Sequence, residues 1–228
     1  MGDAQARLGA GEHRLPGVIA QALAERGVSN DIISDVLADA RKDLSRASRH
    51  SLDQLHQFVV GCRDCSVAST PYLPPKGWTT QEPDLLLVAP QPFTGSETDR
   101  RLIVELKNLG LRSSQCGYTS VMRCLAHKDA TSQDRAAIAS HCAEKFLFAE
   151  IERMNPKVIV PIGVAAAGMV IGETTSEECG VVHYLGAWVV VPVSARWLSA
   201  RSGEGAMSDF RSQMRVAMDA AGVAYGDS

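Results

Sequence analysis

Four cysteines are the residues of this chain whose type and spacing most directly suggest chemistry. Cys62 and Cys65 form a CxxC pair, and Cys124 and Cys142 follow about sixty residues later. Thiolates grouped in this way commonly bind a metal, because two thiols three positions apart can ligate one centre without strain. The pattern predicts a metal site formed by Cys62, Cys65, Cys124 and Cys142.

The spacing leaves the identity of the metal open. Zinc bound by four thiolates usually takes them from two tight pairs, whereas 17 residues separate Cys124 from Cys142. This spacing weakens the case for zinc, and soft thiolates suit a 4Fe-4S cluster equally well. A redox CxxC should begin a helix directly after a strand, but this pair follows a predicted helix, so redox exchange ranks below metal binding. We interpret Cys116 and Cys179 as small buried apolar residues.

The composition indicates one globular domain. The 228 residues are 45% hydrophobic and 21% charged, which is enough to bury a sizeable core. The net charge of -3 argues against a protein that binds polyanions over its whole surface, but it is compatible with a local basic groove. No secretory signal and no long apolar stretch stand out, so we expect a cytoplasmic protein without membrane contact, in which cysteines are thiols or ligands.

The first 50 residues differ in pattern from the rest. Apolar residues recur there at helical spacing, which predicts an N-terminal helical extension over 1–50, with two amphipathic helices broken at 27–29. A third helix is predicted over 51–61, with Ser51 as its N-cap, and it would lead directly to Cys62. We assign 51–228 to the main domain.

The main domain alternates short apolar runs with longer helical periods. Strands are predicted over 85–88, 118–122, 158–161 and 188–191, and helices over 98–109, 133–154, 164–171 and 207–220. This alternation predicts an α/β fold, a three-layer α/β/α arrangement around a central, mostly parallel four-stranded sheet. Ligands of such sheets bind beyond the carboxyl ends of the strands, so the segments after the four strands should line the site.

The order of motifs along the chain resembles the uracil-DNA glycosylase superfamily, in particular its iron-sulfur branches, families four and five. The segments that carry the resemblance are, in chain order, the CxxC pair, Ala89-Pro90, Phe93-Thr94-Gly95, the run 120–124, Cys142 and Pro-x-Val-Ile-Val-x-x-Gly at 156–163. The resemblance covers roughly 58–200. It implies that the four cysteines ligate a structural 4Fe-4S cluster beside the DNA backbone.

The same resemblance implies a base pocket that contains Pro90, Phe93 and Ser120. Phe93 matches the aromatic residue that stacks on a flipped base, although it could equally be a core aromatic. Ser120 stands where the family has an asparagine that reads a pyrimidine edge. A hydroxyl cannot present the paired donor and acceptor of a carboxamide, so we expect weaker or different pyrimidine readout.

The catalytic groups of the family are not retained. The water-positioning loop after the first strand is shortened, and the segment 191–198, which corresponds to the family's His-Pro-Ser, has no histidine. The remaining candidates are Gln91 as a donor and Glu97 and Asp99 as acids. Both acids also suit the first turn of a helix, where they complement its dipole, and we favour that interpretation. His183 is expected to be a surface residue in a hairpin.

DNA contact requires less than catalysis, because basic side chains and backbone amides suffice to bind phosphate. The candidates near the predicted carboxyl ends of the strands are Arg123, His127, Lys128, Ser194, Arg196 and Arg201. Trp197 follows at the place where the family inserts a loop into the minor groove, so it is interpreted either as an apolar wedge or as a core residue.

Three functions remain open from the sequence. The first is a divergent DNA-binding member of the superfamily with weak, altered or absent base excision. The second is an active DNA glycosylase, a hydrolase of N-glycosidic bonds, that acts on an unusual base in DNA repair. The third is a non-catalytic scaffold that binds a protein partner through the N-terminal helices.

Overall fold

The computed structural model describes residues 52–65, 68–71, 82–172, 175–185, 188–198 and 204–224. The helices predicted within 1–50 and the candidate Arg201 lie outside these residues.

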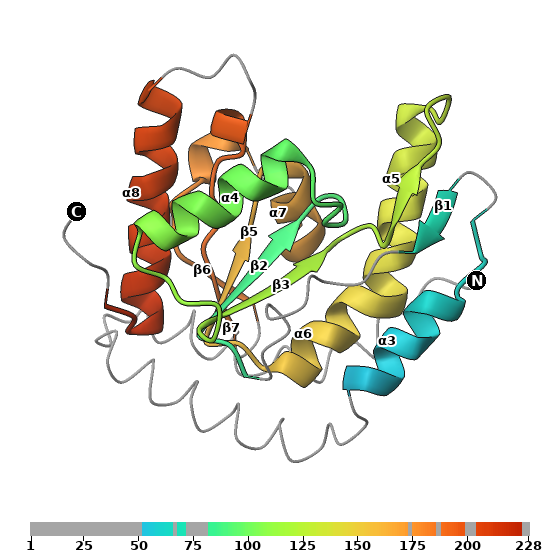
Figure 1. The fold of residues 1–228 in the computed structure, drawn as a ribbon, viewed down its shortest axis with the longest axis horizontal. Coiled ribbons are helices and arrows are strands. Elements are labelled where there is room, and N and C mark those ends of the chain that lie inside the picture. The colour runs from blue at the N-terminus through green and yellow to red at the C-terminus, as the bar shows by residue number, and fades with distance from the viewer. Residues whose placement is uncertain are drawn as a thin grey trace.

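A mostly parallel sheet forms the centre of the described chain (Figure 1). Its strands lie in the order β3 (Cys116–Ser120), β2 (Leu85–Ala89), β5 (Val158–Pro161), β7 (Trp188–Val190) and β6 (His183–Leu185). The first four are parallel, which confirms the predicted four-stranded arrangement. β6 pairs antiparallel with β7 and adds an edge strand, in the hairpin expected around His183. β3 begins two residues before the predicted start and ends at Ser120.

The strands are apolar runs buried on both faces, as parallel strands covered by helices usually are. In β2, the side chains of Leu85 and Leu87 enter one core cluster, whereas Leu86 and Val88 enter the other. This alternation explains why a run without any polar residue can form a strand.

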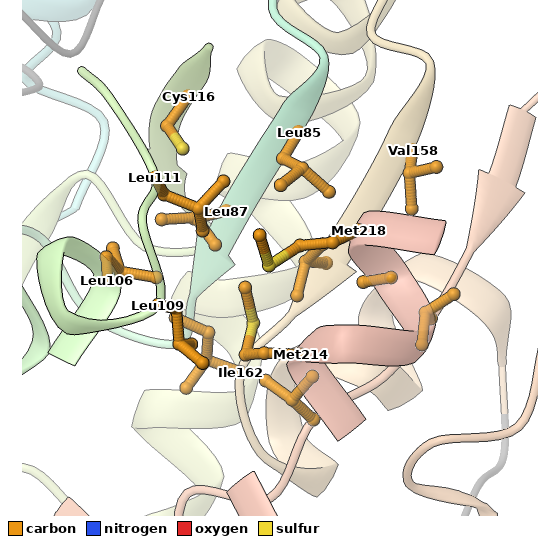
Figure 2. Close-up of a cluster of buried hydrophobic side chains, with 14 of the residues drawn as sticks. Leu85, Leu87, Leu106, Leu109, Leu111, Cys116, Val158, Ile162, Met214 and Met218 are labelled. Atoms are coloured by element: carbon orange, nitrogen blue, oxygen red, sulfur yellow. The ribbon is translucent and has the colours of Figure 1, made fainter. Parts of the chain in front are cut away.

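Helices cover both faces, which confirms the three-layer α/β/α architecture. One face carries α4 (Glu97–Asn108) and α8 (Glu204–Ala221). The other carries α3 (Leu52–Gly61), α6 (Phe148–Met154) and α7 (Val164–Ile171). Figure 2 shows Met214 and Met218 of α8 in this core, together with Leu85, Val158 and Ile162 from the side of the sheet.

The helix predicted over 133–154 is continuous but changes its winding. It consists of α5 (Ser132–Cys142), a π-helical turn (Ala143–Leu147) and α6. Thr131 begins it with a capping box, and Asn155, with a φ of 43°, ends it in the left-handed conformation. The π turn directly follows Cys142, and such turns are frequent at functional sites.

A second small sheet was not predicted. β1 (Ala68–Pro71) pairs antiparallel with β4 (Cys124–Ala126), and Pro71 lies opposite Cys124. No strand is predicted at either segment from the sequence, because strands of three and four residues show no periodic pattern. Among the described helices, none combines the length and apolar composition that a membrane crossing requires.

Candidate functional site

The segments that leave the strands at their carboxyl ends remain bonded to one another. The amide of Val121 donates to the carbonyl of Ala89 at 2.8 Å, and the amide of Gly163 donates to the carbonyl of Val193 at 2.7 Å. The predicted site segments therefore lie side by side along one edge of the sheet, which we call the carboxyl edge.

Phe93 provides an aromatic surface at the carboxyl edge. Its half-buried ring meets the ring of Tyr118 edge to face, with centroids 5.5 Å apart and an angle of 84°. Tyr118 is buried, and this burial, followed by the nearby charge of Asp99, raises the pKa of its phenol well above the ordinary value. A half-exposed ring held by a buried ring is a fixed surface on which a planar group can stack.

The side chain of Ser120 is hydrogen-bonded to the backbone of the turn that follows β3. Its side chain is only 4% exposed, and its hydroxyl donates to the carbonyl of Met122 at 2.7 Å. The amide of Met122 donates in turn to the carbonyl of Pro90 at 3.3 Å. The hydroxyl hydrogen is thus engaged, and the oxygen retains only acceptor capacity toward a ligand.

The two acidic candidates, Glu97 and Asp99, lie in the first turn of α4. Asp99 closes a capping box at the start of α4, where its Oδ2 accepts from the amide of Thr94 at 3.0 Å and the amide and hydroxyl of Ser96 at 2.9 and 2.8 Å. Glu97 has a side chain that is 79% exposed and lies 3.9 Å from Arg100. Gln91 is exposed as well. These positions support the helix-start interpretation of both acids.

The phosphate-binding candidates are divided between surface and interior. His127, Lys128 and Arg196 are exposed. Ser194 is buried, and its amide donates to Oε1 of Gln213 at 2.7 Å, while its hydroxyl accepts from the amide of Arg196 at 3.2 Å. Among the candidates that the structure describes, these three present an exposed polar side chain to solvent.

Two of the candidate DNA contacts, Arg123 and Trp197, are buried. Arg123 is 2% exposed, because its guanidinium forms an ion pair with Glu150 in the interior. Trp197 is fully buried and packs on Phe210, with ring centroids 4.4 Å apart. An indole gains more from burial in this core than from solvent exposure, so Trp197 is a core residue and not a wedge.

Glu150 forms a buried polar network that the sequence analysis missed. Its Oε2 accepts from Nη2 of Arg123 at 2.5 Å and from the hydroxyl of Thr119, and its Oε1 lies 2.7 Å from Nε2 of His56. Burial alone would raise the pKa of Glu150, but the Arg123 charge and the three hydrogen bonds lower that pKa from 4.5 to about 2. The available signal was a glutamate on a helical face that is otherwise apolar, next to Ile151.

Several contacts bring the cysteine segments together. Oδ2 of Asp64, which lies between Cys62 and Cys65, pairs with Nε2 of His141 at 2.9 Å and with the ammonium of Lys145. These two partners flank Cys142. Cys65 packs against the small cluster that contains Cys142, and β1 pairs with the strand that begins at Cys124.

The electrostatics of the thiols also indicate a shared neighbourhood. Burial, with the charges of Cys142, Cys62 and Cys65 added, raises the pKa of Cys124 to about 11. Burial, with Cys142 and Cys62 added, raises the pKa of Cys65. Thiols whose ionised forms would repel one another are a donor set that suits a soft cation, since bound metal would offset the repulsion.

The geometry does not identify a metal. Within the described ranges, no three or more His, Cys, Asp or Glu side chains are grouped closely enough to hold a metal ion. All six cysteines lie in these ranges, and all six are free thiols. Thiolates around one zinc ion would stand about 3.8 Å apart, from the zinc–sulfur distance and tetrahedral geometry, whereas a four-iron cluster separates its ligands further.

The comparison with protein families identifies the fold and its family. The model of the uracil DNA glycosylase superfamily matches residues 81–216, which extend from β2 into α8. The matched range contains the carboxyl edge, Cys124 and Cys142, but it begins after Cys62 and Cys65. No curated protein matches the chain. Because the match spans more than half of the chain and the sheet has the expected architecture, the protein belongs to the uracil DNA glycosylase superfamily.

Proposed function

We propose that this protein is a divergent member of the superfamily that binds DNA at the carboxyl edge and has weak, altered or absent uracil excision. The observation that carries the proposal is the hydrogen bond from the Ser120 hydroxyl to the Met122 carbonyl. It engages the only hydrogen-bond donor of the Ser120 side chain, at the position where the resemblance places a pyrimidine-reading asparagine. A site that cannot satisfy both edge groups of a base discriminates poorly between bases.

Two further features support reduced catalysis. The carboxylate of Asp99 accepts hydrogen bonds in the N-terminal cap of α4, so this candidate acid has a structural role. The segment 191–198 after β7 has no histidine, although the resemblance places one there that stabilises the departing base. Excision in this superfamily depends on such electrostatic groups, so their loss should slow it strongly.

DNA binding is supported by features that do not depend on catalysis. His127 and Lys128, which follow β4, and Arg196, which follows β7, are exposed, and Phe93 offers a stacking surface at the carboxyl edge. Basic side chains for phosphates and an aromatic ring for a base are the minimal requirements for a single unstacked nucleotide.

The test measures excision and binding on the same preparation. Purified protein is incubated with strands that contain uracil, hypoxanthine or xanthine, and abasic sites are counted while binding is followed by fluorescence anisotropy. We expect binding with little or no uracil release. Ser120→Asn should increase uracil discrimination, whereas Ser113→Asn, at an exposed position before β3, serves as the matched control. Rapid release of uracil by the natural protein would refute the proposal.

A second candidate, excision of an unusual base, is favoured by the rigid pair formed by Phe93 and Tyr118. Such a platform would hold a purine as well as a pyrimidine, because every base has a stacking face. Release of hypoxanthine or xanthine that disappears in Phe93→Ala would establish this activity in place of the first proposal.

We also propose that Cys62, Cys65, Cys124 and Cys142 ligate a 4Fe-4S cluster, with zinc as the alternative. Support comes from the four-thiol donor set and from the mutual effect of these thiols on their pKa values. When bound, the cluster would supply a structural cross-link between three chain segments and no redox step. Protein purified without oxygen should contain about four irons per chain and absorb light at about 400 nm. Stoichiometric zinc without iron would contradict the assignment.

A cytoplasmic location is part of the same proposal. It is supported by the six free cysteines, because a reducing compartment keeps thiols in that state. Fractionation of cells should place the protein with cytosolic markers.

A further inference from the structure

The carboxylate of Glu150 is the centre of a buried network whose other members come from α3, β3 and the turn after β3. Its Oε1 lies 2.7 Å from Nε2 of His56, and its Oε2 accepts from Nη2 of Arg123 at 2.5 Å and from the hydroxyl of Thr119. The side chains of Glu150 and Arg123 are 1% and 2% exposed, and that of His56 is 14% exposed. Both carboxylate oxygens are occupied, so the position of Glu150 constrains those of its partners.

The segments that meet in this network also carry the four cysteines of the proposed metal site. Cys62 directly follows α3, and its amide donates to a carbonyl of the last turn of that helix at 3.1 Å. Cys124 is the residue after Arg123. Cys142 ends α5, and the π-helical turn joins α5 without a break to α6, which contains Glu150. The network therefore links the three backbone segments to which the thiols are attached.

Arg123 also interacts with the thiol of Cys142. Burial raises the pKa of this thiol, whereas a hydrogen bond from the backbone of Arg123 and the charge of its guanidinium act in the opposite direction. Nε of Arg123 is buried and has no hydrogen-bond partner among the described residues. This N–H group is available to a further acceptor, and a metal-bound thiolate is one.

The energetics of a buried ion pair favour a role in geometry. Such a pair often adds little net stability compared with apolar side chains of the same volume, because both charges lose their hydration. Its directional hydrogen bonds nevertheless fix the relative positions of the groups that they join. Side chains that lie behind metal ligands act in this way, and their replacement typically lowers metal affinity by about 10–100-fold.

We propose that Glu150 and Arg123 are positioning residues for the thiol site. Their ion pair, joined to α3 through His56, holds the three cysteine segments beside one another before a metal binds. Metal binding then has to order less of the chain, which favours retention of the metal. This inference rests on the proposed metal site and adds the residues that maintain its shape.

The experiment measures how fast the protein, purified with its bound iron or zinc, loses that metal to an excess of EDTA. Metal content and absorption are followed at a temperature at which thermal melting shows every variant to be folded. Glu150→Gln and Arg123→Met should lose the metal on the order of tenfold faster than the natural protein, or more.

Trp197→Ala is the control for stability. Its indole belongs to the core cluster on the other face of the sheet, and its removal should destabilise the fold about as much as the loss of one network charge. Trp197→Ala should therefore lose metal clearly more slowly than Glu150→Gln and Arg123→Met. An equal acceleration in all three variants would mean a general loosening of the fold and would overturn the proposal.

His56→Ala tests the link to α3 with a milder change. It removes one hydrogen bond and leaves the ion pair in place, so the variant should fold and lose metal several-fold faster than the natural protein. Gln57→Ala is the matched control, since Gln57 is the next residue of α3 and is exposed. Equal rates of metal loss in these two variants would overturn the link through His56.

The natural protein distinguishes this inference from the proposed metal site. If it contains neither iron nor zinc, both are overturned. If it retains metal and the network variants retain it equally well, the thiol site stands and the positioning role of Glu150 and Arg123 is refuted.

Discussion

Replacement of Glu150 by glutamine tests the buried network most directly. The change removes one negative charge at nearly constant shape, and it leaves the guanidinium of Arg123, which is 2% exposed, without its counter-charge. His56 and Thr119 lose their charged acceptor at the same time. Each of these partners comes from a different segment, so the variant should loosen α3, β3 and the turn between β3 and β4 together.

The expected loss is large because a buried charge without a partner is costly. Removal of one member of a buried ion pair typically destabilises a protein by about 3–5 kcal/mol. Domains of this kind are stable by only about 5–15 kcal/mol, so Glu150→Gln should unfold at a much lower urea concentration than the natural protein. Arg123→Met should have a similar effect, because it leaves the carboxylate of Glu150 unpaired.

A double-mutant cycle provides the quantitative assay. Urea unfolding is measured for Glu150→Gln, Arg123→Met and the double variant, under identical conditions. The double variant should lose clearly less than the sum of the two single losses, since it no longer contains an unpaired buried charge. Losses that add within about 0.5 kcal/mol would refute the argument, because they would mean that the two side chains do not depend on each other.

The pH dependence gives an independent check. The pKa of Glu150 lies at about 2 in the folded protein and near 4.5 in the unfolded chain. Its contribution to stability is therefore complete above about pH 4.5 and is lost as the pH falls toward 2, with a total on the order of 3 kcal/mol. The stability difference between the natural protein and Glu150→Gln should shrink over this window. A difference that stays constant from pH 7 to pH 3 would contradict the assigned pKa.

Three further variants test the remaining assignments. Trp197→Ala should lower the free energy of unfolding by about 3–5 kcal/mol, as expected for a fully buried indole, whereas a DNA wedge would lower only the DNA affinity. Asp99→Ala should cost about 1 kcal/mol in urea unfolding through loss of the α4 cap and leave any excision rate unchanged; a lost rate would restore Asp99 as a catalytic residue. Cys124→Ser should lose bound iron, measured by metal analysis, whereas Cys179→Ser should retain it, and equal iron in both would argue against Cys124 as a ligand.

Local patterns were sufficient to predict most of the fold. The apolar runs at 85–88 and 158–161 form strands at those places, and the long amphipathic period after Thr131 forms one helix. These elements can be predicted because a buried strand or an amphipathic helix is encoded by neighbouring residues. The pairing of β1 with β4 was missed, since it joins two short segments through long-range backbone contacts.

The candidate site was predictable to a smaller extent. The sequence indicated that the segments after the strands would meet, and the carboxyl edge confirms that arrangement. It did not indicate that the Ser120 hydroxyl would bond to Met122, or that Asp99 would close a capping box with Ser96. Such hydrogen bonds depend on atomic positions that the residue type alone does not specify.

The sequence by itself determined the thiol pattern, the alternation of strands and helices, and the family to which the chain belongs. Only the tertiary structure decided which charged and aromatic residues face solvent. By residue type and position, Arg123 was a candidate phosphate contact, but in the structure it pairs with the buried Glu150, 27 positions away. Trp197 was a candidate wedge, but in the structure it packs on Phe210. The physical reason is that burial is a property of long-range packing: the free energy of an arginine or a tryptophan depends on the partner that the fold brings to it.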